Sequence, residues 1–413
     1  MPGRTWIIAP DSETLLARWG TLKAAPPQQM DELFTPHMNG DELGDRHSAK
    51  VLTDALPRFP VRISSVRDDE EGCIAPVPLA YRSFDRQWVI PDKRLINRPN
   101  PDLWQTRSDR QIFLTALSRT SPSKGPALTA SALLPDIDHY NGRGGRVFPL
   151  WSDAASTRPN LKPALLSHLS ASLGVPIGPE DLISYIVAIA ASAAYTKRFQ
   201  PDLSTPGLRI PITIDTALFS AAADLGRRVL WLHTFGERMA APAAGRPFGP
   251  PRVSVNPPSV PLAGRISSKS EDFPDFLNYD EEKRRLLVGH GYIDNVSQAV
   301  WAYEVSGKHV LTHWFSYRKL HRERPVIGDR RPPSALNEIQ PNHWLPEYTT
   351  ELLNVLNVLT LLIELEPAQA DILDRICAGP LLSHEALVAA NALTVPLKPE
   401  KLKKQKANQP QLF

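Results

Sequence analysis

Cysteine is nearly absent from this chain, and long apolar runs are missing. Two cysteines, Cys73 and Cys377, stand far apart among 413 residues and form no CxxC spacing. This pattern indicates neither a disulfide framework nor a zinc ribbon, and it fits a reducing, cytoplasmic compartment. The first residues do not form a signal peptide, and the most apolar stretch, 182–194, is too short to span a bilayer. We therefore expect no membrane association.

Net charge is also small. The chain has 47 basic and 44 acidic residues, so its formal charge of +3 does not by itself predict nucleic-acid binding. A hydrophobic content of 42% and a charged content of 22% describe a soluble globular protein, and the length predicts two or three domains or subdomains. The 41 prolines predict stiff loops and interrupted helices.

The sequence is rich, locally, in aromatic rings that alternate with cations. The clearest stretch is 81–104, YRSFDRQWVIPDKRLINRPNPDLW. Cationic side chains bind phosphate, and arginine or asparagine can read base edges in a groove. The same composition also makes an ordinary strand packed on a core. From these residues alone both interpretations stay open.

Hydrophobic periodicity predicts an α+β fold. A β-rich recognition subdomain is expected at about 61–151, followed by a helical subdomain, a further small β region and C-terminal helices. The expected strands lie at 61–66, 73–79, 87–90, 111–117, 127–134 and 308–315. The first expected helix begins near Asp11, and the next runs from about Pro163 to Gly174. Another spans 179–199, and a further one follows a cap at Asp215. The last spans 346–366, where Pro367 breaks it.

Composition shifts predict five segments. They are an N-terminal segment at 1–60, a recognition domain with a β part and a helical part at 61–239, a proline-rich linker at 240–263, a second β region with C-terminal helices at 264–380, and a C-terminal helix with a basic tail at 381–413.

Motifs for catalysis are weak. The run 256–259 is NPPS, in which Ser259 replaces the ring that a methyltransferase stacks on a flipped base. The acidic run 274–283 resembles a metal nuclease core, but its two halves are too close for adjacent strands. His309 and His313 have metal-ligand spacing, but on a strand without an accompanying glutamate they are packed or half-exposed side chains. We expect no catalysis by this chain.

Two basic segments keep both interpretations open. The run 142–146, GRGGR, is either a tight hairpin loop or a loop that presents Arg143 and Arg146 to phosphate. The run 317–331, YRKLHRERPVIGDRR, is either a solvated face or, with Trp314 and Tyr317, a second aromatic–basic surface for nucleic acid.

Several motifs together resemble one known family. The stretch 81–104 is similar to the YRPFD-x-RW element that opens the C-terminal specificity region of type ISP restriction-modification enzymes, with Ser83 in place of the common proline. The resemblance continues in order through LLPDIDHYNGRGGRVFPLW, RPNLKPALL, EDLISYIVAIAASAAYTKRF and LFSAAADLGRRVLWLHTFGER. It resumes at GYIDNVSQAVWAYEVSGKHVLTHWFSYRK and EYTTELLNVLNVLTLLIELEPAQADILDRICAGPL, and so covers most of 60–380.

The resemblance implies a target recognition domain that holds duplex DNA and recognises a short site while a methyltransferase flips and methylates an adenine. Helicase motifs, a glycine-rich methyl-donor loop and an NPP-aromatic loop are missing, so no catalytic residue carries over. S-adenosylmethionine is expected only in a partner methyltransferase, and residues 1–60 resemble the exit from such a domain. Beginning with Met, the chain is expected to be a split subunit, a truncated remnant or a fragment.

The predicted DNA contacts are mostly cations. Asn97, Arg82 and Asp85 are expected near the groove as base or structural contacts. Phosphate clamping is predicted for Arg86, Lys93, Arg94, Arg98, Arg143, Arg146, Arg318, Lys319, Arg330 and Arg331. The alternative is an inactive scaffold that binds protein partners through helices 179–199, 215–238 and 346–366. A self-sufficient methyltransferase or nuclease is a third hypothesis. The recognised base sequence and the oligomeric state do not follow from the residues.

Overall fold

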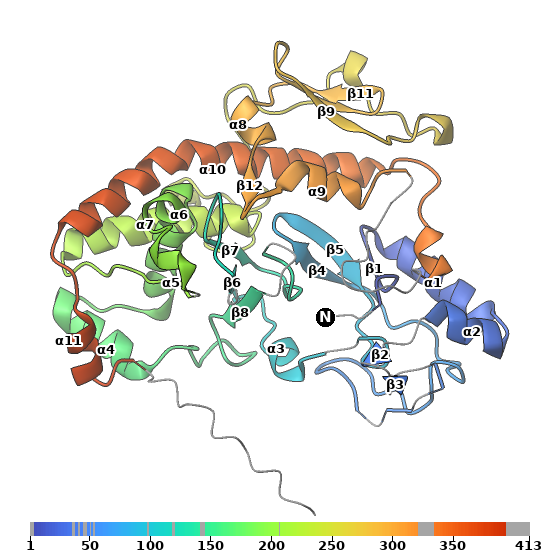
Figure 1. Ribbon diagram of the computed structural model, residues 1–413, viewed down its shortest axis with the longest axis horizontal. Helices are drawn as coiled ribbons and strands as arrows, with labels where there is room; N and C mark the ends of the chain where they lie inside the picture. Colours follow the sequence, from blue (N-terminus) through green and yellow to red (C-terminus); the bar gives the residue numbers. More distant parts are fainter. Residues whose placement is uncertain are drawn as a thin grey trace, which may run out of the picture.

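The computed structural model confirms the α+β prediction, since small antiparallel sheets pack against a layer of helices (Figure 1). The structure describes residues 4–34, 38–39, 42–43, 48–49, 51–52, 54–96, 99–117, 120–140, 145–205, 207–320 and 334–393.

The first sheet joins the N-terminus to the aromatic–basic stretch. Its strand order is β1 (Ile8–Ala9), β5 (Asp85–Val89) and β4 (Val77–Arg82), all antiparallel. Helices α1 (Ser12–Ala24), α2 (Pro27–Phe34) and α3 (Pro101–Gln105) lie beside it. As expected, α1 begins after Asp11, whose carboxylate accepts the Thr14 N–H. The apolar side chains of this segment bury themselves against the β4–β5 hairpin, which ties the N-terminal residues to the rest.

The second sheet has the order β7 (Leu128–Ser131), β6 (Phe113–Leu117) and β8 (Gly145–Pro149). A bridge between Ala80 and Pro135 links it to the first sheet, because the Ala80 N–H donates to Leu134 and the Asp136 N–H donates to Ala80. Backbone hydrogen bonds therefore connect the two sheets.

Helices cover the β7 side of the second sheet. Those of the main layer are α5 (Pro179–Ala190), α6 (Ala193–Arg198), α7 (Thr216–His233) and α10 (Pro346–Ala378). The others are α4 (Pro163–Leu173), α8 (Gln298–Trp301), α9 (Val310–Ser316) and α11 (His384–Ala389). The caps at Asp215 and Gly174 are confirmed, and Gly174 has the left-handed φ of 69° that ends α4.

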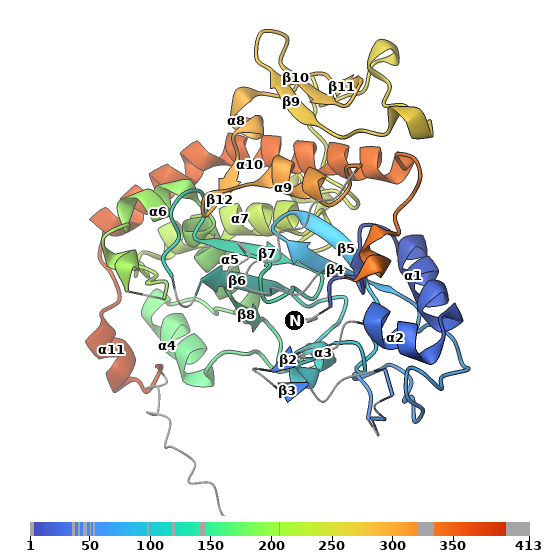
Figure 2. The same cartoon turned by 45° about the vertical axis from the view of Figure 1, so that its right-hand side comes forward.

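A third small sheet stands on the far side of α10 from the main body (Figures 1 and 2). It consists of β9 (Leu277–Asp280), β10 (Arg285–Val288) and β11 (Gly291–Ile293). Two two-residue pairs complete the strands: β2 (Met38–Asn39) with β3 (Glu42–Leu43), and β12 (Glu304–Val305) with β13 (Lys308–His309). The second β region expected after residue 264 is therefore present.

The predicted helix break at Pro367 is wrong. Helix α10 runs through this proline for 33 residues. Proline leaves one carbonyl of the preceding turn without its N–H partner. The turns that follow are nonetheless held by burial of Ile372, Leu373 and Ile376, and by Gln369, whose amide donates to the Ala188 and Ala191 carbonyls at 3.0 and 3.2 Å. Tertiary packing thus outweighs the local cost.

Length and composition alone would allow α10 to cross a membrane. In the fold, however, one face of α10 packs on α5, α6 and α7 and contributes to the main apolar core. This is the environment of a core helix.

The predicted strand at 308–315 is also wrong. Only Lys308–His309 pair as a strand, and Val310–Ser316 form α9, with His309 at its N-cap. The alternation of apolar and polar residues there equally places Val310, Leu311, Trp314 and Phe315 on one helical face, and all four are buried. The periodicity fits both structures, and packing selects the helix.

Two further boundaries differ from the predictions. No strand forms at 61–66, where the carbonyl of Ser64 accepts a hydrogen bond from the Arg94 side chain instead of a neighbouring strand. The single helix expected at 179–199 is divided, because Ser192 has extended backbone and caps α6 with its hydroxyl. The proline-rich segment is tied to the core, since the Pro247 carbonyl accepts from the Trp231 indole at 3.0 Å.

Candidate nucleic-acid interface

The first part of the aromatic–basic stretch, residues 81–89, lies in the β4–β5 hairpin, at the centre of the molecule beneath α9 and α10 (Figure 1). Its turn residue Phe84 has a φ of 61°, a left-handed conformation that costs an L residue about 1–2 kcal/mol. Burial of the Phe84 ring against His233 and Tyr303 offsets this cost. Tyr81 and Phe84 are buried, so these rings support the core and do not form a stacking platform.

Arg318 joins the hairpin to two helices. Its guanidinium contacts the Asp85 carboxylate at 2.8 Å and the Glu351 carboxylate at 3.0 Å. It also donates to the carbonyls of Trp314 and Arg86 and lies 3.9 Å from the centre of the Trp314 ring. The side chain is fully buried. We call Asp85, Arg318 and Glu351 the Arg318 cluster.

Asp85 is held entirely inside the protein. Its second carboxylate oxygen accepts from the Gln87 amide at 2.7 Å. Burial raises the pKa of the Asp85 carboxyl, and the positive charge of Arg318 opposes that rise. Removing either partner would leave an uncompensated buried charge. The structure thus shows a structural role for Asp85 and Arg318, and a DNA contact by either stays a prediction.

Arg94 has the same kind of environment. Its side chain is 3% exposed and contacts both Asp69, at 2.5 Å, and Asp92. A further donor of Arg94 reaches the Ser64 carbonyl at 3.0 Å. Its neighbour Lys93 pairs with Asp54. Both cations therefore bind carboxylates within the protein.

The remaining cations in and beside the hairpin are partly accessible. Arg82 contacts Asp136 at 3.0 Å and covers the Tyr81 ring at 3.9 Å. Arg86 pairs with Glu237, and both side chains are 35% exposed. Lys319 is also partly exposed, directly after the buried Arg318. Arg86 and Lys319 are thus the cations of this region that could meet a polyanion without breaking the core.

Two buried histidines beneath the hairpin were not predicted. His139 lies 3.1 Å from the Thr115 hydroxyl through Nδ1, and Nδ1 of His233 accepts the Ala130 N–H at 3.0 Å. Burial lowers the pKa of each histidine to about 3. The DIDHY run could have drawn attention to His139, whereas His233 has no signal beyond its place at the end of a helix.

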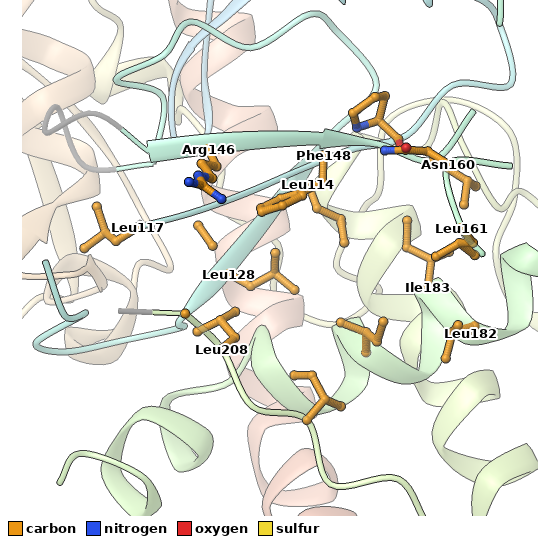
Figure 3. A pocket seen from close by; sticks show the side chains of 16 residues that line it. Leu114, Leu117, Leu128, Arg146, Phe148, Asn160, Leu161, Leu182, Ile183 and Leu208 are labelled. Carbon is orange, nitrogen blue, oxygen red and sulfur yellow. The ribbon is translucent and has the colours of Figure 1, made fainter. Parts of the chain in front are cut away.

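Arg146 occupies a different setting. It is exposed on strand β8, and no acidic side chain of the described residues pairs with it. It borders a cavity of about 430 Å³ between the second sheet and α5. Figure 3 shows the Arg146 guanidinium and the Phe148 ring directed from β8 toward this cavity, with Leu182 and Ile183 opposite.

The other predicted contacts lie outside the described residues. These are Asn97, Arg98, Arg143, Arg330 and Arg331, whose role stays a prediction. Within the described ranges, no group of three or more His, Cys, Asp or Glu side chains is placed to hold a metal ion.

Three solved structures resemble this fold. The cryo-EM structure of a DrdV–DNA complex has a TM-score of 0.51 at 16% identity, over 91% of this chain and 34% of that chain. A nuclease-deletion mutant of the Type ISP restriction-modification enzyme LlaGI with a DNA substrate mimic has 0.46 at 14%, over 75% and 21%. The ATP-dependent Type ISP restriction-modification enzyme LlaBIII bound to DNA has 0.49 at 14%, over 75% and 19%.

The first of these likenesses supports a shared fold. The chain spans about a third or less of the length of each structure it resembles. No curated protein matches the sequence.

The sequence itself identifies the family. Residues 1–355 match the Type ISP C-terminal specificity domain. The match includes segment 1–60 and the whole β4–β5 hairpin, and it confirms the resemblance first seen in the YRSFD and PDIDHY motifs. The chain therefore belongs to the family of Type ISP C-terminal specificity domains.

Proposed function

We propose that this chain is the DNA sequence-recognition subunit, or a fragment, of a type ISP-like restriction-modification system. It binds duplex DNA and positions it for a methyltransferase that another domain or chain supplies. The family match over residues 1–355 is the observation that carries the proposal. Two of the structural neighbours are described as Type ISP restriction-modification enzymes, and all three are complexes with DNA or a DNA mimic.

The proposal assigns no catalysis to this chain. S-adenosylmethionine would bind to the partner methyltransferase, and the protein would act in the cytoplasm. This chain would act as a rigid scaffold that is aligned on the duplex. Phosphate contacts would fix its register, and base contacts would give sequence specificity. The buried ion pairs of Arg94 and Arg318 would provide that rigidity. The proposed phosphate contacts are then Arg86 and Lys319, together with Arg98, Arg143, Arg330 and Arg331.

Duplex selection from a random pool tests the proposal. The full chain, alone and together with a methyltransferase, is incubated with randomised duplexes at low and moderate salt. Enrichment of one short asymmetric motif, together with affinity that falls steeply as salt rises, is the expected result. A chain that binds no duplex at low salt in either form would contradict the proposal and favour the inactive scaffold.

A further inference from the structure

Strand β8 is an edge of the second sheet. The opposite edge, β7, is covered by α5 and α7, whereas β8 pairs only with β6 among the described residues. An uncovered sheet edge presents backbone N–H and C=O groups that another strand can bind.

The hydrogen bonds show which groups of β8 face outward. The Gly145 N–H donates to Ile137 and not to β6, and the Leu150 N–H donates to Ile112. Bonded and non-bonded pairs alternate in an antiparallel ladder, so Arg146 and Phe148 are the residues bonded to β6. Val147 therefore directs its N–H and C=O away from β6. The carbonyl of Pro149 also faces outward, where it accepts from the Asn160 amide at 3.0 Å.

Each face of this strand borders an apolar cavity. On the face of Arg146 and Phe148 lies the α5 cavity, of about 430 Å³, whose walls include Leu114, Leu128, Phe148, Ile183, Ile186 and Leu208. On the face of Val147 lies the α3 cavity, of about 390 Å³, whose walls include Leu79, Ile96, Leu103, Trp104, Leu134 and Val147. Phe148 is 44% exposed and Ile137 is 40% exposed, so apolar surface also surrounds the edge.

We propose that the β8 edge is a docking site for an extended peptide segment of a partner protein, which pairs with the Val147 backbone and inserts side chains into both cavities. Successive side chains of a strand point to opposite faces. One peptide residue opposite Val147 would enter the α3 cavity, and its neighbours would enter or cover the α5 cavity. Backbone bonds give affinity in this mode of recognition, and the cavities give specificity.

The positive charge of Arg146 further restricts the sequence of the peptide. Arg146 borders both cavities, is exposed, and has no acidic partner among the described residues. The peptide residue opposite Arg146 is therefore acidic, and the residue opposite Phe148 is apolar. Alkyl side chains fit the apolar walls better than a phosphate or a polar base edge does, so the geometry favours a peptide over DNA at this edge. The inference goes beyond the proposed function and does not depend on it.

Two labelled peptides test the site on the full chain. They are acetyl-Ser-Leu-Val-Glu-Ser-amide, for antiparallel pairing, and acetyl-Ser-Glu-Val-Leu-Ser-amide, for parallel pairing. We expect one of them to show saturable binding by fluorescence anisotropy. N-methylation of the peptide residue whose N–H donates to the Val147 carbonyl should weaken binding at least tenfold; this residue is the valine in the antiparallel peptide and the leucine in the parallel peptide. The N-methyl peptide leaves the protein unchanged, so folding does not affect this arm. Absence of binding by both peptides at millimolar concentration overturns the proposal.

A matched pair of variants tests the edge itself. Val147→Pro removes the outward N–H without removing a bond to β6, since proline is tolerated on edge strands. It should weaken peptide binding at least tenfold, whereas Val147→Ala should keep binding within about threefold. Arg146→Glu should reverse the preference, so that a peptide with lysine in place of glutamate binds better. Equal binding by Val147→Pro and Val147→Ala contradicts the proposal.

Binding of duplex DNA by the same variants is the last test. We expect DNA affinity to be unchanged in Val147→Pro, which separates this site from the proposed DNA contacts. If duplex DNA displaces the peptide and Arg146→Glu weakens DNA binding tenfold, the edge belongs to the DNA interface and the peptide proposal falls.

Discussion

The β4–β5 hairpin and the β8 edge both combine arginines with aromatic rings, but they use them in opposite ways. Beside the hairpin, Arg94 and Arg318 are buried and bonded to carboxylates. At the edge, Arg146 is exposed beside two apolar cavities and an exposed Phe148. An arginine–aromatic pattern therefore does not by itself indicate a binding surface. The position of the nearest carboxylate decides whether the cation is structural.

The largest effect is expected at Arg318. Arg318→Ala leaves Asp85 as an unpaired buried charge, so the free energy of unfolding should fall by about 3–5 kcal/mol. Lys319→Ala, one residue further along, should change it by less than about 0.5 kcal/mol. Urea denaturation of the two variants measures the difference. Similar stabilities would contradict the structural role of the Arg318 cluster.

Acid should destabilise the region beneath the hairpin. His139 and His233 have pKa values of about 3 in the folded protein and about 6.5 when unfolded. A depressed pKa contributes stability that is fully present above pH 6.5 and is lost as pH falls toward 3. At pH 5 each histidine should therefore remove about 2 kcal/mol of unfolding free energy.

Urea titrations at pH 7 and pH 5 measure this loss. Protonation of His233 would have to break the bond that its Nδ1 accepts from Ala130. The variant His233→Gln should be less stable at pH 7 but should lose about half as much between the two pH values. If the parent and the variant lose the same unfolding free energy between pH 7 and pH 5, groups other than His233 cause the loss.

A smaller effect is expected at Arg86. Its ion pair with Glu237 is 35% exposed, so Arg86→Ala should cost about 0.2–1 kcal/mol and the cost should shrink in high salt. Thermal unfolding at two salt concentrations tests this value. A loss as large as that of Arg318→Ala would show that solvent exposure does not distinguish surface arginines from buried structural ones.

The smallest effect is expected at the edge. Arg146→Ala removes no ion pair seen in the described residues, so the free energy of unfolding should stay within about 0.5 kcal/mol of the parent value. Denaturation under the same conditions as for Arg318→Ala gives the direct contrast. A cost above about 2 kcal/mol would mean that Arg146 is as structural as the buried arginines.

Sequence reasoning succeeded where the signal was local or carried by motifs. The helix start near Asp11, the caps at Asp215 and Gly174, the α+β class and the family all followed from short runs of residues. It failed where distant packing decides. Helix α10 continues past Pro367 because Gln369 bonds to the end of α5. No local pattern contains that contact.

The candidate site shows the same limit. Arg318 was predicted as a phosphate contact in a basic run near Trp314, but its partners Asp85 and Glu351 come from other parts of the chain. Charge and spacing do not reveal such pairing, so burial of the cation could not be foreseen. His139 and His233 were missed for the same reason, because their environment is created by strands and helices that meet only in the fold.

The most direct test of this account compares two triple variants for DNA binding by fluorescence anisotropy across a salt series. One replaces Lys319, Arg330 and Arg331 with glutamine and leaves the buried Arg318 intact. The matched control replaces the exposed Lys197, Lys269 and Lys283, which removes the same charge. We predict that the first variant binds at least tenfold more weakly, with a log–log salt slope shallower by about 3 and an unchanged melting temperature, whereas the control resembles the parent. Equal affinity and equal slope in the two variants would contradict the account.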